Sequence, residues 1–91
     1  PDQCVIYRIQ ATNTSSTALG FNLNALTISD LLSNFSAGAD LVAGSPATSA
    51  TASSTAGTPS ATSTAVLGTN FTIVPQGVGT LTFKIKIKND R

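Results

Sequence analysis

The feature that most constrains the fold is an alternating stretch, residues 81–88, near the end of the chain. Side chains of a β-strand point to opposite faces with period 2, so every second residue shares a face. The apolar face is formed by Leu81, Phe83, Ile85 and Ile87, and the polar face by Thr82, Lys84, Lys86 and Lys88. This pattern is typical of a half-buried strand in an antiparallel β-protein, and it predicts a strand over about residues 78–88.

A second long strand is predicted near the start of the chain, over residues 4–12. Val5, Tyr7, Ile9 and Ala11 share one face, whereas Ile6 falls on the otherwise polar face. Shorter apolar runs predict further strands at 19–23, 26–28, 39–42, 66–67 and 71–74. Residues 30–35 fit a single helical turn. Seven or eight short strands separated by turn signals favour an all-β fold, an immunoglobulin-like antiparallel β-sandwich that forms one domain over residues 1–91.

Residues 45–65 form a low-complexity segment of Ser, Thr, Ala, Gly and Pro without charge. One interpretation is a disordered tract, with hydroxyl groups available for O-glycosylation. The other is a hairpin with strands at 47–52 and 60–65 and a turn near 57–59, because Thr favours strands and long unstructured loops are uncommon in compact domains. We favour the hairpin.

Composition narrows the classes of function. The net charge is +1 and charged residues make up 10% of the chain, so strong attraction to nucleic acid is not expected. The polar residues are instead 11 Ser and 14 Thr, a composition that we associate with secreted and cell-surface proteins of microbes. No apolar run approaches the length of a membrane span, so we expect no membrane insertion.

Reactive side chains are scarce, and we predict no catalytic, cofactor-binding or metal-ligating residues and no enzymatic activity. The chain has no His and no Glu, and its four Asp residues are scattered. General acid–base catalysis and calcium binding both depend on convergent groups that this spacing does not provide. The single cysteine, Cys4, is interpreted either as a small buried hydrophobe or as an unpaired thiol available to a neighbouring chain.

Several short motifs resemble those of the DUF11 repeat family of prokaryotic surface proteins. Residues 7–14 are similar to its opening strand and Asn-Thr turn, and residues 26–32 to its Asp-x-Leu signature. The closing motifs correspond to 67–69, 75–77 and 80–85. The chain departs from the family pattern at 33–36, where a Pro-x-Gly turn is usual. The resemblance implies an immunoglobulin-like module of a cell-surface or extracellular protein, without catalytic residues.

We therefore predict an extracellular structural module, part of a surface protein or a filament, whose partners are copies of itself or tandem neighbouring modules. The long strands at the two ends of the chain are expected to complete sheets of neighbours, because exposed sheet edges accept added strands. The residues predicted to form this contact are Val5, Tyr7, Ile9, Leu81, Phe83, Ile85 and Ile87. The alternative is an adhesin-type binding module that recognises glycans or host surfaces.

Glycosylation is a further expectation. Asn13, Asn34 and Asn70 each begin an Asn-x-Ser/Thr sequence, the acceptor pattern for N-linked glycans. In the low-complexity segment we expect O-linked modification at Thr48, Thr51 and Ser60.

Overall fold

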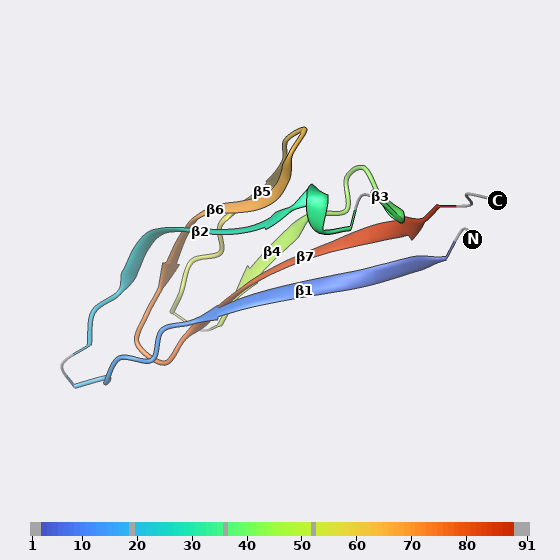
Figure 1. The fold of residues 1–91 in the computed structure, drawn as a ribbon. Helices are drawn as coiled ribbons and strands as arrows, with labels where there is room; N and C mark the ends of the chain where they lie inside the picture. Colours follow the sequence, from blue (N-terminus) through green and yellow to red (C-terminus); the bar gives the residue numbers. More distant parts are fainter. Residues whose placement is uncertain (1–2, 19, 36, 52, 89–91) are drawn as a thin grey trace.

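The computed structural model describes residues 3–18, 20–35, 37–51 and 53–88 (Figure 1). The described chain is all-β, and its seven strands form two antiparallel sheets that pack on each other as an immunoglobulin-like sandwich, as predicted. The elements are β1 (Cys4–Thr12), β2 (Leu23–Leu31), the 3-10 helix η1 (Leu32–Asn34), β3 (Ala39–Leu41), β4 (Ala47–Ala50), β5 (Thr58–Ala61), β6 (Ala65–Ile73) and β7 (Val78–Ile87). The sandwich is elongated, with extents of 56 × 20 × 19 Å.

The first sheet is built around β7, the strand that has the clearest alternating pattern in the sequence. On one side, β1 pairs with β7 along its whole length, from Cys4 opposite Lys86 to Thr12 opposite Val78. The short strands β3 and β4 both pair with β7 as well, and so they share its other side. Both terminal strands lie where the sequence pattern predicts them, and the start of β1 lies beside the end of β7 (Figure 1).

The second sheet has the order β2-β6-β5. The apolar runs 66–67 and 71–74, predicted as separate strands, belong to one long strand, β6. An extra residue in β6 shifts its register against β2, and Asn70 there adopts a left-handed conformation with φ of 68°. Because a bulge of this kind changes the phase of the strand, Val66 and Phe71 are both fully buried although they are five positions apart.

The low-complexity segment does not form the predicted hairpin. Its two strands belong to different sheets, since β4 pairs with β7 and β5 pairs with β6. The chain crosses from one sheet to the other between them, and the hydroxyl of Thr48 donates a hydrogen bond to the carbonyl of Gly57 across this crossing. The prediction was wrong because strand propensity says nothing about partners. Each of the two segments pairs with a long central strand instead of with the other segment.

Hydroxyl groups of this segment replace missing strand pairing. Between β3 and β4, the Ser45 hydroxyl accepts a hydrogen bond from the backbone N–H of Lys84 at 3.0 Å. The Thr51 hydroxyl accepts a hydrogen bond from the backbone N–H of Val78 at 2.8 Å. The Ser54 hydroxyl accepts one from the backbone N–H of Val74 at 3.1 Å. Backbone donors that lack a strand partner need such substitutes, which gives part of the Ser/Thr content a structural role.

The core lies between β6 and β7. Its buried apolar residues are Ile28, Ala39, Ala65, Val66, Phe71, Ile73, Leu81, Phe83 and Ile85. At the centre, Phe71 is surrounded by backbone at close range: a Cβ added to Gly57, Gly68 or Gly79 would lie within 2.7–2.9 Å of its ring atoms. Only residues without a side chain fit there, so these glycines shape the pocket that the Phe71 ring fills.

Candidate assembly interface

The outer edge of β1 is the main candidate site for contact with another molecule. In the described part of the chain, β1 has a strand partner on one side only, namely β7. The Gln3 carbonyl accepts a hydrogen bond from Ile87 at 2.8 Å, and the Asn13 N–H donates to the Gly77 carbonyl at 3.0 Å. The backbone N–H and C=O groups of successive residues point to opposite sides of a strand. Those of the odd-numbered residues therefore point toward β7, and those of the even-numbered residues from Cys4 to Thr12 point to the open edge.

Apolar side chains on both faces of β1 are exposed next to this edge. Ile6 is 62% exposed on the outer face, and Val5 (41%) and Tyr7 (37%) are exposed on the face turned toward the second sheet. Ile6 was not among the predicted contact residues. Its signal was present in the sequence, since it is the apolar residue that interrupts the polar face of the strand.

Tyr7 is anchored from the inside of the sandwich while its remaining surface stays open. The centroid of its ring lies 5.5 Å from that of Phe83 and 5.9 Å from that of Phe35. The rings of Phe35 and Phe83 stack on each other with their centroids 5.7 Å apart. Such aromatic contacts restrict the ring to one orientation. The structure therefore holds an amphipathic side chain in a fixed place at the sheet edge.

The other sheet edges carry features that hinder strand addition. Pro59 interrupts the row of N–H donors in β5, which is only four residues long. Two register irregularities interrupt β2, and Ala25 within it has φ of 55°. On the far side of β7, β3 and β4 are short and are separated by Gly44 and Pro46. Proteins commonly protect edges in these ways, whereas β1 runs over nine residues without Pro, Gly or a bulge.

The other predicted contact strand, β7, is not available at an edge. It is paired on both sides, by β1 and by β3 and β4. Leu81, Phe83 and Ile85 are at most 3% exposed and Ile87 packs against the same core. These four residues are therefore corrected from assembly contacts to internal core of the subunit, because a central strand has no free backbone groups to offer. Val5, Tyr7 and Ile9 remain at the β1 edge, with Ile9 half-buried.

Two glycosylation candidates are withdrawn because their side chains are used internally. Asn13 is 4% exposed, and its Nδ2 donates hydrogen bonds to the carbonyls of Phe21 at 2.6 Å and Ile73 at 2.9 Å. Thr48 is half-buried and its hydroxyl is bonded to Gly57. Attachment of a glycan requires an accessible amide or hydroxyl, which neither residue offers in the folded chain.

The other glycosylation candidates lie on the surface. Asn34 is exposed, with its Nδ2 donating to the Asp30 carboxylate at 2.6 Å. Asn70 is exposed at the bulge of β6, and Ser60 is exposed on β5. Thr51 is exposed too, although its hydroxyl accepts the hydrogen bond from Val78. Cys4 is an exposed free thiol at the start of β1, so the interpretation as a buried hydrophobe does not hold.

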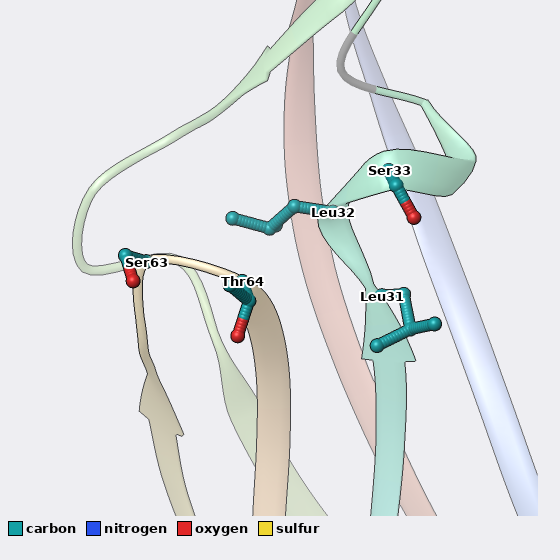
Figure 2. Close-up of a pocket in the computed structure, with 5 residues that line it drawn as sticks. All are labelled: Leu31, Leu32, Ser33, Ser63 and Thr64. Carbon is teal, nitrogen blue, oxygen red and sulfur yellow. The ribbon is translucent and has the colours of Figure 1, made fainter.

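A shallow depression lies where η1 meets the β5–β6 turn (Figure 2). It has a volume of about 360 Å³ and is lined by Leu31, Leu32, Ser33, Ser63 and Thr64. Leu32 extends toward the turn that carries Ser63 and Thr64 (Figure 2). The size suits a small ligand, but the lining holds no charged or aromatic side chain to orient one.

The described residues contain no cluster of three or more His, Cys, Asp or Glu side chains that would hold a metal ion. Across the same residues, no helix has the length and apolar character needed to cross a membrane. Comparison of the chain with protein-family models, curated proteins and solved structures found no match.

Proposed function

We propose that this chain is a non-enzymatic, extracellular structural module of a prokaryotic cell-surface protein or filament, which assembles with neighbouring copies through a sheet edge. The observation that carries the proposal is the open edge of β1, where outward backbone groups coincide with the exposed side chains of Val5, Ile6 and Tyr7. Strand addition at such an edge supplies affinity through main-chain hydrogen bonds and specificity through alternate side chains.

An extracellular location is supported by composition and by resemblance. The scarcity of charge and the abundance of Ser and Thr match secreted microbial proteins, and the motifs similar to the DUF11 family suggest a surface protein. Part of the hydroxyl content has an internal role in this fold, as the contacts of Ser45 and Thr51 show. The location is tested by protease treatment of intact source cells, since a surface module is digested while an internal marker protein is not.

The adhesin alternative has less support. Glycan-binding sites usually contain exposed aromatic rings that stack on sugars, together with convergent polar groups. Here Tyr7, Phe35 and Phe83 pack on one another and Phe71 is buried. Phe21 is 81% exposed, but the ring contacts within the described residues join Tyr7, Phe35 and Phe83 and do not include it.

Self-association is the direct test of the proposed function. Light scattering on the purified chain over a wide concentration range, at low and at high salt, is expected to show oligomers that persist at high salt. Burial of apolar surface is not screened by ions, whereas attraction between surface charges is. A chain that stays monomeric at high concentration under both conditions contradicts assembly through an edge.

A further inference from the structure

We infer that two copies of this chain join by pairing their β1 strands antiparallel about a two-fold axis, with Tyr7 opposite Tyr7 of the second copy. The inference rests on the proposed assembly function and specifies its edge, its partner and its register. Pairing of this kind would join the two β7-centred sheets into one continuous sheet across both molecules.

Backbone geometry limits the possible registers. The outward N–H and C=O groups belong to the even-numbered residues of β1, so these must form the hydrogen-bonded pairs with the second strand. A two-fold axis perpendicular to the sheet also keeps the inner faces of both copies on the same side. Even residues then face even residues, and the axis passes between the two copies of a single residue. The choices near the middle of β1 are Ile6, Tyr7, Arg8 and Ile9.

Charge, overlap and the exposed apolar residues select among these four. An axis at Arg8 places the two guanidinium groups directly opposite each other, and like charges in that position are destabilising. An axis at Ile6 places Arg8 opposite Cys4, where β1 begins, so the overlap is short. An axis at Tyr7 overlaps residues 4–10 of both strands and an axis at Ile9 overlaps residues 6–12, and both avoid the repulsion. Only the Tyr7 axis keeps Val5, Ile6 and Tyr7, the exposed hydrophobics of β1, all within the overlap.

The Tyr7 register also covers the exposed apolar surface. On the inner face, Val5 meets Ile9 of the second copy on each side of the tyrosine pair. On the outer face, Ile6, the most exposed of the β1 hydrophobics, meets Arg8, whose methylene groups pack over it while the guanidinium remains in water. Lys84 is next to Ile6 on β7, so Lys84 and Arg8 of the second copy lie two strands apart, about 10 Å and near the screening length. The two Arg8 residues are diagonal neighbours, about 7–8 Å apart, instead of directly opposite each other.

Disulfide trapping tests the register in the full chain. In a Cys4→Ser background, Tyr7→Cys places two thiols on the axis, in a non-hydrogen-bonded pair with Cα atoms about 4.5 Å apart, a spacing that a disulfide spans. Mild oxidation is expected to yield a covalent dimer on a non-reducing gel. Val5→Cys and Ile9→Cys are each expected to stay monomeric alone but to cross-link when mixed. Efficient homodimers of Ile9→Cys, or no cross-link in any of these samples, would overturn the proposed register.

Sedimentation separates failure of this inference from failure of the proposed function. Ile6→Lys is expected to raise the dimer dissociation constant about tenfold or more, because a lysine at the edge opposes strand addition. Leu31→Lys is the matched control, since Leu31 is a comparably exposed leucine (55%) on β2, and it should leave association unchanged. If oligomers persist in Ile6→Lys and Tyr7→Cys does not cross-link, another edge assembles the protein and this inference fails alone. If the unmodified chain is always monomeric, both fail.

Discussion

The environments of Phe71 and Tyr7 differ sharply, although both are aromatic residues of β-strands whose side chains face the interior of the sandwich. Phe71 is fully buried, whereas Tyr7 keeps 37% of its surface exposed. The cause is the place of the strand in its sheet. Phe71 belongs to β6, which has neighbours on both sides, and Tyr7 belongs to β1, which has one neighbour. Burial of an inward-facing residue is therefore decided by lateral position as much as by the face on which it lies.

The contacts of the two rings differ in kind as well. Backbone at Gly57, Gly68 and Gly79 closes around Phe71, which leaves no room for adjustment. Tyr7 instead touches the rings of Phe35 and Phe83 and keeps one side open. The first region stabilises the subunit, and the second offers surface to a neighbour. The same division predicts how substitutions should behave.

Truncation of the two aromatic residues should give the largest contrast. Phe71→Ala is expected to lower the free energy of unfolding by about 3–5 kcal/mol, the usual range for a buried aromatic residue, because the rigid backbone around it cannot close the cavity. Tyr7→Ala should cost about 1 kcal/mol, the centre of the distribution for single substitutions. Urea denaturation at a dilution that favours monomers measures both. Equal losses would show that the two regions are packed alike.

A methyl group added beside Phe71 should also destabilise the chain. Gly79→Ala is expected to cost about 1–3 kcal/mol through overpacking, since its Cβ would lie 2.6 Å from Ile73 Cδ1. Gly38→Ala serves as the control, because a Cβ there meets nothing within 4 Å. The control should be neutral or slightly stabilising, and thermal unfolding of the pair decides the point. A tolerated Gly79→Ala would mean that the Phe71 region adjusts more readily than its geometry indicates.

Removal of the Asn13 amide should come next in size. Asn13→Ala leaves the carbonyls of Phe21 and Ile73 without this donor, at an expected cost of about 1–3 kcal/mol. Asn34→Ala removes an exposed amide that bonds Asp30 and should change stability little. Denaturant midpoints of the two variants provide the measurement. A loss in Asn34→Ala as large as in Asn13→Ala would contradict the role given to burial.

The smallest effect on stability is expected at the open edge. Ile6→Lys should change the free energy of unfolding by no more than about 0.5 kcal/mol, because its side chain is largely in solvent already. Association, measured in parallel by light scattering, should be the property that falls. If Ile6→Lys unfolds the monomer, Ile6 belongs to the stabilising region and the contrast between the two regions is lost.

Local periodicity in the sequence determined much of the fold. Alternation predicted β1 and β7 nearly to their ends, and Pro75-Gln76-Gly77, a triplet of turn-forming residues, forms the turn between β6 and β7. The helical turn predicted within 30–35 appears as η1. These features depend on residues close together in the chain, so a period of 2 or a turn-forming triplet carries the information. The same reasoning located Val5, Tyr7 and Ile9 of the candidate interface.

The tertiary structure alone decided which strands have free edges. β7 lies near the end of the chain yet occupies the centre of its sheet, and the strands on either side of the low-complexity crossing join different sheets. The bulge at Asn70, which turns Phe71 inward, depends on pairing with β2. Side-chain alternation fixes the two faces of a strand, but hydrogen bonds between strands join residues far apart in the chain. Only the assembled sheets therefore show that β1 has an edge left to share.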